Sequence, residues 1–445
     1  MPPTEPGSPA PPAPGRPLPG GLVVHRFAPT GRPAAEDARA ALFVRTVERG
    51  FYEPEPTGEA LDQLLGHEHA DGRTYTGVYE AGADPAVDRP VGTFAGFGKR
   101  LHVGGGRDVD ALLVSAVTVA PSHRRRGILR ALMESELALA AAAGTPLAAL
   151  TASEATIYRR FGFGAATALR RVEVDVRGDA ALAGPVSGTV RLVEPAELAA
   201  IGPEVFERTR RQVPGSVERM ASYAAHETDT VAGDRAGRGG LYAAVHHDDG
   251  GTPRGYVTYR FAGWDTEPAT VRVSQLYAST AAGTRALWAF LASLDLVERI
   301  AWRSAPDDGV LEHLFADHRR VRTTHREDHL WLRLLDVPAA LGARPYAHDG
   351  EVTLRVHDRL GHAAGDWRLS VAGGAAAVGR AAAGAGAAAP DLELDVADLS
   401  AAYLGGVPAE VLRQAGRVAE HRRGAAAELS GLLAPDRPVH CMTGF

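Results

Sequence analysis

Hydrophobic and polar positions alternate along the first part of the chain in a way that predicts strands and helices in turn. Apolar runs and alternations at residues 22–27, 74–79, 91–101, 111–119 and 147–151 predict strands. Apolar side chains recur every three or four positions in residues 35–52 and 127–143, which predicts two helices, and residues 154–160 predict a helical turn. A strand at residues 169–176 is expected to close this unit. The order predicts an α/β unit with a mainly antiparallel sheet.

Residues 180–325 repeat this order of elements. Strands are predicted at residues 189–193, 241–246, 256–261 and 269–277, and helices at residues 196–226 and 283–296. Because the order recurs at a spacing of roughly 150 residues, we expect an internal duplication. A third stretch begins near residue 328. It contains predicted strands at residues 352–356, 367–371 and 391–396, an Ala/Gly-rich span at residues 372–389, and two amphipathic helical patches. Residues 439–445 are apolar and are expected to be extended.

The composition excludes several classes of protein. Hydrophobic residues make up 45% and charged residues 23% of the chain, which is typical of soluble globular proteins. The net charge of −6 gives no indication of nucleic-acid binding, and a weakly acidic chain is compatible with amine substrates. With Cys441 as the single cysteine, no intrachain disulfide and no Cys-rich metal site can form. We expect no membrane span and a cytoplasmic location, because no apolar run reaches the ~18 residues that a span needs.

The most specific motif is Val117-Thr-Val-Ala-Pro-Ser-His-Arg-Arg-Arg-Gly-Ile-Leu-Arg130, which places a strand, a basic loop and the start of a long helix in succession. A helix N-terminus presents unpaired N–H groups and a partial positive charge, and both favour a diphosphate. Gly127 allows close approach of the backbone, and the arginines add charge. The alternative is a basic loop that only solvates the surface.

A second motif, Leu150-Thr-Ala-Ser-Glu-Ala-Thr-Ile-Tyr-Arg-Arg-Phe-Gly-Phe163, follows after a short interval. Together the Arg-x-x-Gly loop and the Tyr-x-x-x-Gly-Phe sequence resemble the GNAT acyl-CoA N-acetyltransferases. The resemblance implies that the loop holds the pyrophosphate of acetyl-CoA, that the pantetheine lies along the preceding strand, and that the tyrosine protonates the departing thiolate. The chain departs from the family pattern at Leu129, where Gly or Ala is usual.

The rest of the chain narrows this resemblance. Two GNAT-like halves, followed by a stretch containing Asp391-Leu-Glu-Leu-Asp-Val-Ala-Asp-Leu-Ser-Ala-Ala-Tyr-Leu-Gly-Gly406, resemble the enhanced intracellular survival (Eis) family. The resemblance implies an α/β (α+β) fold of tandem GNAT-like domains with mixed, largely antiparallel sheets and a sterol-carrier-like α+β domain. The expected parts are a disordered, Pro-rich leader at residues 1–20, a catalytic GNAT domain at 21–178, a degenerate GNAT-like domain at 179–326 and a sterol-carrier-like C-terminal domain at 327–445. The resemblance to the Eis family also implies that the chain assembles as a homohexamer.

The same resemblance implies the residues of the active site. The residues expected to bind acetyl-CoA are Val117, Thr118, Val119, Arg125, Arg126, Gly127, Ile128, Leu129, Arg130, Ser153 and Glu154. Tyr158 is the implied general acid, and the α-carboxylate of Phe445 is the implied base. No metal is expected. A tyrosine with its ordinary pKa of about 10 is protonated at neutral pH and can donate a proton. The alternatives are that Tyr158 is a packed aromatic and that Phe445 is an apolar plug.

The sequence therefore predicts an acetyl-CoA-dependent transferase that acetylates primary amines by direct transfer in a ternary complex. Aminoglycosides, polyamines and lysine-like amines are the substrates that the resemblance implies. Two alternative functions remain open. One is an N-acyltransferase that uses longer acyl-CoA, because the tandem arrangement also resembles N-myristoyltransferase. The other is a non-enzymatic lipid carrier. The residues at 246–249 and 53–56 are interpreted as turns, and His325 and His329 as surface histidines. Glu154 is the next candidate for the base.

Overall fold

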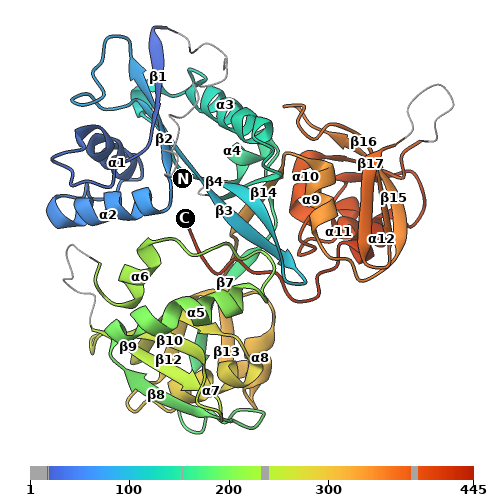
Figure 1. The fold of residues 1–445 in the computed structure, drawn as a ribbon. Helices are drawn as coiled ribbons and strands as arrows, with labels where there is room; N and C mark the ends of the chain where they lie inside the picture. Colours follow the sequence, from blue (N-terminus) through green and yellow to red (C-terminus); the bar gives the residue numbers. More distant parts are fainter. Residues whose placement is uncertain (1–17, 19, 153, 232–239, 382–388) are drawn as a thin grey trace, which may run out of the picture.

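The computed structural model describes residues 18, 20–152, 154–231, 240–381 and 389–445. These residues form three lobes, each built on one β-sheet with helices packed against it (Figure 1). The first and second lobes lie one above the other in this view, and the third lies to their right. The C-terminus lies between the first two lobes, although the last helices of the chain belong to the third.

The sheet of the first lobe has seven strands among the described residues, and α-helices cover both of its faces. Its strands are, in spatial order, β1 (Leu22–Phe27), β2 (Thr74–Glu80), β3 (Gly92–Gly104), β4 (Arg107–Val119), β5 (Leu147–Thr151), β14 (Leu330–Leu334) and β6 (Gly164–Ala165). Only the pair β4–β5 is parallel. Helices α1 (Ala38–Gly50) and α2 (Gly58–Ala70) pack on Phe27 and Tyr75, whereas α3 (Ile128–Ala142) packs on Phe94 and Val114. The short α4 (Ala155–Tyr158) follows β5.

The second lobe repeats this plan. Its strands are, in spatial order, β8 (Thr189–Val193), β9 (Leu241–His247), β10 (Pro253–Phe261), β11 (Thr270–Ala278), β12 (Arg299–Pro306), β7 (Ala168–Asp175) and β13 (Val321–Asp328). Again one pair, β11–β12, is parallel. The helices are α5 (Leu198–Arg210), α6 (Ser222–Glu227), α7 (Ala281–Ala292) and α8 (Val310–Leu314). The matching order of pairings supports the predicted duplication.

The two lobes exchange one strand each, and the sequence did not predict this. The strand expected to close the first unit, observed as β7, lies instead in the second sheet between β12 and β13. In return β14, placed by sequence in the third stretch, lies in the first sheet between β5 and β6. Sheet membership therefore does not follow the expected boundaries at 178/179 and 326/327.

Several further elements differ from the prediction. Helix α2 was not expected, because only Leu61 and Leu65 of its thirteen residues are buried and its apolar pattern is correspondingly weak. The single helix expected at residues 196–226 is two helices, α5 and α6, separated by a turn at Pro214 and Gly215. Strands β12 and β13 were also missed. The expected leader, except for residues 18 and 20, and part of the Ala/Gly-rich span lie outside the described residues.

The third lobe contains a sheet of five strands within the described part of the chain. Its strands are, in spatial order, β17 (Ala375–Arg380), β16 (Gly365–Ala372), β15 (Gly350–His357), β18 (Leu392–Asp395) and β19 (Val418–Glu420). Its helices are α9 (Val337–Ala343), α10 (Val396–Ala402), α11 (Ala409–Gln414) and α12 (Ala425–Leu432). The hydrophobic core of this lobe is continuous with that of the first, since Leu101 and Leu332 belong to the same buried cluster as Leu354 and Leu399.

The last nine residues, 437–445, form no helix or strand and are called the C-terminal segment below. Ser216 donates a hydrogen bond to the carbonyl oxygen of His440 at 2.9 Å, and the Gly444 N–H donates to the Tyr223 hydroxyl at 2.9 Å. The segment thus lies extended against the second lobe and leads toward the first. No helix of the described residues is long and apolar enough to cross a membrane.

Candidate active site

Strands β4 and β5 separate toward their C-terminal ends and leave an opening in the first sheet. They pair only from Ala111 to Val114 of β4 and from Leu147 to Leu150 of β5. Beyond that point β4 bends, because Ala116 adopts a left-handed conformation with φ of 54° and the register against β3 shifts. Thr93 holds the bend by donating a hydrogen bond from its hydroxyl to the Ala116 carbonyl at 2.8 Å.

The bend frees one edge of β4 at three of the predicted cofactor residues. Thr118 and Val119 pair with β3 alone in the described residues, and Val117 follows directly after the bend. A strand edge with free N–H and C=O groups can bind an extended chain that contains amides. The edge at Val117, Thr118 and Val119 could therefore bind a chain of the kind expected there from the sequence.

The arginine-rich loop and the start of α3 form the second part of the predicted cofactor site. Arg125 and Gly127 are both left-handed, with φ of 63° and 83°, so the loop turns sharply before the helix begins at Ile128. No acidic residue occupies the first turn, and no side chain caps its N–H groups. The first helical residues therefore have backbone N–H groups that could donate hydrogen bonds to a phosphate, namely those of Ile128, Leu129 and Arg130.

The arginines of this loop are available for an anion. Arg124, Arg125, Arg126 and Arg130 are exposed, and none of their side chains forms an ion pair or hydrogen bond with another described residue. Four cations around an uncapped helix N-terminus attract a negatively charged group, and a diphosphate matches them in charge. The loop fits the group predicted for it. Ser153 lies outside the described residues, and Glu154 is exposed.

A cavity of about 330 Å³, called the first cavity, lies where β4 and β5 separate and brings together both predicted catalytic residues. Its lining consists of Val47, Glu48, Phe51, Glu68, Arg73, Val114, Ser115, Ala116, Val117, Leu150, Thr151, Tyr158 and Phe445. Phe445 is separated from Tyr158 by 287 positions in the sequence, so only the tertiary fold places them in one cavity. Val117 also lines this cavity, so the cavity is adjacent to the strand edge that is predicted to bind pantetheine.

Tyr158 ends α4 and is 8% exposed. Its ring packs edge to face against Phe163, with 6.3 Å between the ring centroids. Tyr158 is therefore both a packed aromatic and a residue that lines the first cavity. The two interpretations weighed from the sequence are compatible.

Phe445 is held at the cavity by contacts from two strands of the first sheet, and the residues before it by a histidine next to a third strand. The Thr151 hydroxyl on β5 donates a hydrogen bond to the main-chain oxygen of Phe445 at 3.0 Å. The phenyl ring packs edge to face on Phe97 of β3, with centroids 6.2 Å apart. His329, which precedes β14, contacts the Thr443 carbonyl through Nε2 at 3.1 Å. We expected His329 to be a surface histidine, and this is corrected: it is half-buried and holds the C-terminal segment.

Two carboxylates in the first cavity were missed by the sequence analysis. Burial raises the pKa of Glu68 to about 7, although Arg73, at 3.3 Å, opposes the shift. Tyr75 donates a hydrogen bond to Glu68. Burial also raises the pKa of Glu48, and nearby Glu53 adds to the effect. Glu68 lies on α2, the helix whose weak pattern left it unpredicted, so no sequence signal indicated it.

The remaining candidates from the sequence have structural contacts. Glu55, from the turn at residues 53–56, forms an ion pair with Arg89 at 2.8 Å and does not line the first cavity. Asp248 accepts hydrogen bonds from the N–H groups of Gly250 and Thr252, as expected of a turn residue. Among the described residues, no three His, Cys, Asp or Glu side chains gather in a way that could hold a metal ion.

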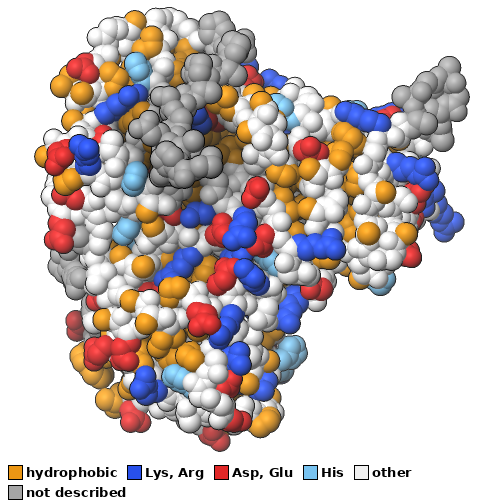
Figure 2. All heavy atoms as spheres, viewed as in Figure 1, with side chains coloured by type: hydrophobic (Ala, Val, Ile, Leu, Met, Phe, Trp, Pro, Cys, Tyr) orange, Lys and Arg blue, Asp and Glu red, His pale blue; other side chains and the backbone are white. Residues whose placement is uncertain are grey.

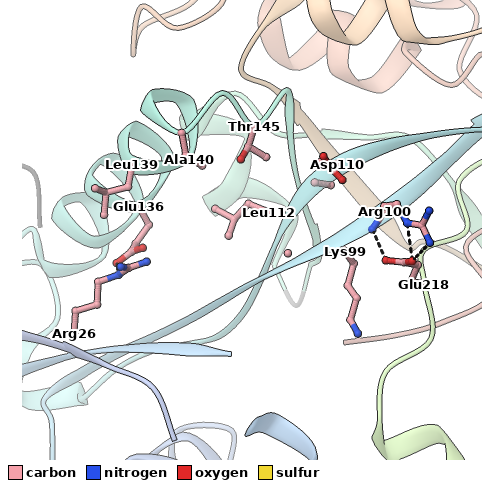
Figure 3. Close-up of a pocket in the computed structure, with 13 residues that line it drawn as sticks. Arg26, Lys99, Arg100, Asp110, Leu112, Glu136, Leu139, Ala140, Thr145 and Glu218 are labelled. Carbon is pink, nitrogen blue, oxygen red and sulfur yellow. Dashed lines mark hydrogen bonds and ion pairs between the residues drawn. The ribbon is translucent and has the colours of Figure 1, made fainter. Parts of the chain in front are cut away.

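Another cavity of about 430 Å³ lies against the C-terminal half of α3, whereas the arginine loop precedes the N-terminus of this helix. Several charged residues line the cavity (Figure 3). Arg100 forms an ion pair with Glu218, and Arg26 lies 3.6 Å from Glu136. Lys99 is bound to Asp71 at 2.8 Å. None of the residues predicted for the active site lines this cavity. On the face drawn in Figure 2, acidic and basic side chains are interspersed.

Comparison with protein families divides the chain into three matched parts. Residues 32–166 and residues 215–334 each match a family described as an acetyltransferase (GNAT) domain. Residues 337–442 match a sterol carrier protein domain. The matches agree with the expected fold of tandem GNAT domains followed by a sterol-carrier-like domain.

Comparison with individual proteins gives relatives over most of the length. N-acetyltransferase Eis of Mycobacterium tuberculosis is 38% identical over 379 residues, which cover 83% of this chain and 89% of the relative. A Streptomyces avermitilis protein named as an N-acetyltransferase is 37% identical over 418 residues, which cover 90% of this chain and 95% of that relative. The crystal structure of Eis1 from Mycobacterium abscessus superposes with a TM-score of 0.77 at 31% identity, covering 95% of this chain and 100% of that one.

Proposed function

Because this chain belongs to the Eis family of GNAT N-acetyltransferases, we propose that it transfers the acetyl group of acetyl-CoA directly to a primary amine in a ternary complex. The observation that carries the proposal is the first cavity, which lies where β4 and β5 separate and which both Tyr158 and Phe445 line. The arginine loop lies at the start of the helix that follows β4. One linear molecule could therefore bind at the loop and place its thioester in the cavity.

The proposed reaction uses two groups of the protein for proton transfer. The neutral amine attacks the thioester carbonyl, and the bond between carbonyl carbon and sulfur breaks. The α-carboxylate of Phe445 accepts the proton that the amine loses, and the Tyr158 hydroxyl donates a proton to the departing thiolate. The hydrogen bond from Thr151 to Phe445 supports this role, because it fixes the position of a carboxylate that is intrinsically a weak base.

We propose cationic amines, such as aminoglycosides, polyamines or lysine-like amines, as the acceptors. Glu48, Glu68 and the terminal carboxylate outnumber the single cation Arg73 in the first cavity when Glu68 is ionised. An excess of carboxylates attracts an ammonium group and disfavours anionic acceptors.

The proposal is tested with a panel of amines, measured by release of free thiol from acetyl-CoA. We expect thiol release that depends on a cationic amine and that yields the N-acetylated product by mass spectrometry. The same assay with longer acyl-CoA chains tests the rival N-acyltransferase activity. Thiol release that no amine stimulates would contradict the proposal.

Replacing Arg125 or Arg126 by alanine is expected to raise the KM for acetyl-CoA about tenfold or more and to leave kcat nearly unchanged. The phosphates do not change during acetyl transfer, so ground state and transition state lose the same interaction. Charge-assisted hydrogen bonds contribute about 1.5–3 kcal/mol, less where solvent screens them. Arg423→Ala is the control, since Arg423 is exposed in the third lobe. A kcat defect at unchanged KM would place these arginines outside the cofactor site.

Glu68→Gln is expected to remove part of the pH dependence of stability. The pKa of Glu68 in the folded chain is raised to about 7 from an ordinary value of 4.5. Between these values the unfolded chain releases the proton and the folded chain keeps it, so the wild type loses stability as the pH rises, by roughly 3 kcal/mol at most. Above pH 7 the loss is complete.

The measurement is urea unfolding at several values between pH 4.5 and pH 8.5. The free energy of unfolding of the wild type, relative to Glu68→Gln, should fall across this range. Glu59→Gln, on the exposed side of the same helix, should follow the wild type. Parallel curves for the wild type and Glu68→Gln would show that Glu68 ionises normally.

A further inference from the structure

A second, larger cavity lies in the second lobe, at the position that the first cavity's opening has in the first lobe. Strands β11 and β12 pair only from Thr270 to Val273 and from Arg299 to Trp302, and then separate. Past Val273, β11 pairs with β10 alone in the described residues. The space between them is a cavity of about 660 Å³, which we call the second cavity. It is within the range of small-molecule sites.

The interior of the second cavity is apolar. Trp288 and Trp302 line it with ring centroids 6.1 Å apart, and Leu311 lies beside them. Trp288 and Trp302 are 1% and 9% exposed, so the cavity reaches the core of the lobe. Hydroxyl groups, including those of Ser274 and Ser304, line other parts of it. This distribution suits a ligand with an apolar end and a polar body.

Two buried polar atoms of the lining have no hydrogen-bond partner in the described part of the chain. They are Oε1 of Gln275 on β11 and Nδ1 of His440 on the C-terminal segment. His440 is 6% exposed, and burial lowers its pKa to about 3, so the ring is neutral at pH 7. A buried polar atom without a partner is costly, and the amide oxygen of Gln275 can only accept. A ligand that donates hydrogen bonds, as an amide N–H does, would satisfy Gln275.

The charges around the second cavity favour one anionic group. Arg285 and Arg437 line it against a single acidic residue, Asp308. Among the described residues, Arg285 donates one hydrogen bond to the Pro185 carbonyl and Arg437 donates one to Gln212, so each guanidinium has further N–H groups that an anion could use. Unlike α3, helix α7 has a side-chain cap, because the Thr280 hydroxyl oxygen accepts a hydrogen bond from the Gly283 N–H. The second cavity therefore has no counterpart of the arginine loop at which a diphosphate could bind.

From these contacts we infer that the second cavity binds a linear amide-containing molecule with an apolar end and a single anionic end. The apolar end packs against Trp288 and Trp302, the amides lie along the free edge of β11 beside Gln275, and the anion meets Arg285 or Arg437. Pantetheine 4′-phosphate has this chemistry and serves as the probe. The inference does not depend on acetyl transfer by the first lobe.

The test is a titration of the full chain with pantetheine 4′-phosphate in the absence of acetyl-CoA, followed by intrinsic tryptophan fluorescence. We expect a saturable change, because Trp288 and Trp302 line the site. Ser304→Phe places a ring at the exposed edge of the cavity and should weaken binding at least tenfold, whereas Ser304→Ala should bind as the wild type does. Gln275→Leu, which removes the unpartnered acceptor, should weaken binding several-fold. Circular dichroism verifies that each variant is folded.

The probe could also bind at the β4–β5 opening, so Arg126→Ala separates the two sites. Binding that survives Arg126→Ala and is lost in Ser304→Phe supports the second cavity. Binding lost in Arg126→Ala and retained in Ser304→Phe overturns the inference, as does the absence of both a saturable fluorescence change and a bound probe in native mass spectrometry. The amine panel tests acetyl transfer separately, so failure of one proposal is distinguishable from failure of the other.

Discussion

Lengthening the chain by a few residues beyond Phe445, or deleting Phe445, is expected to abolish nearly all kcat. In both variants the terminal carboxylate is no longer at its present position, where it accepts a hydrogen bond from the Thr151 hydroxyl at 3.0 Å. Deletion moves the carboxylate back to Gly444, about 3.5 Å along an extended chain, and removes the ring that packs on Phe97. Losing a positioned proton acceptor costs about 10²–10⁴-fold, and the extension would also fill the first cavity.

The experiment compares kcat for variants extended at either end. An extension of equal length before Met1 is the control, because it does not alter the α-carboxylate of Phe445. The KM for acetyl-CoA of both forms is measured, since a misfolded first lobe would also lose cofactor binding. Equal kcat from the two forms would exclude the terminal carboxylate as base. Glu68 would then be the next candidate rather than Glu154, because Glu68 lines the cavity and Glu154 does not.

Tyr158→Phe is expected to lower kcat by about 10²–10⁴-fold with little change in the KM for acetyl-CoA. The phenylalanine ring keeps the edge-to-face contact with Phe163, so the fold of this region is preserved and only the hydroxyl is lost. The thiolate must then leave without a proton from the protein.

The control for this variant is Tyr52→Phe, since Tyr52 is 84% exposed. The defect should become smaller with an acyl donor whose thiol is more acidic, because such a leaving group needs less protonation. Wild-type turnover by Tyr158→Phe would leave Tyr158 with its packing role alone.

Local patterns predicted most of the elements that carry the cofactor site. The strand ending at Val119, the loop with Gly127 and helix α3 are adjacent in sequence, so their chemistry could be interpreted without knowledge of the fold. The residues expected at the strand edge and the helix N-terminus lie in a geometry that fits their proposed roles. Phe445 was placed in the site by family resemblance, because nothing in residues 439–445 alone indicates where the segment lies.

The features that sequence could not predict depend on contacts between distant segments. The raised pKa of Glu68 results from burial that only the tertiary fold produces, and Glu68 lies on a helix with two buried leucines. The role of His329 requires the C-terminal segment to cross from the third lobe. The exchange of β7 and β14 was missed because alternation along a strand predicts its two faces but not its neighbours.

The strand exchange has a consequence for how the protein is made on the ribosome. When residues up to about 178 have emerged, the first sheet still lacks β14, so β5 and β6 have no strand between them. Translation must continue through Leu334 before that gap can be filled, and by then the second sheet has already received β7. Domains usually fold as units from the N-terminus during synthesis. Here the first lobe cannot complete its sheet until the second lobe has been synthesised. A chain truncated after the first lobe would have a sheet in which the facing edges of β5 and β6 are unpaired, and unpaired strand edges are prone to aggregation.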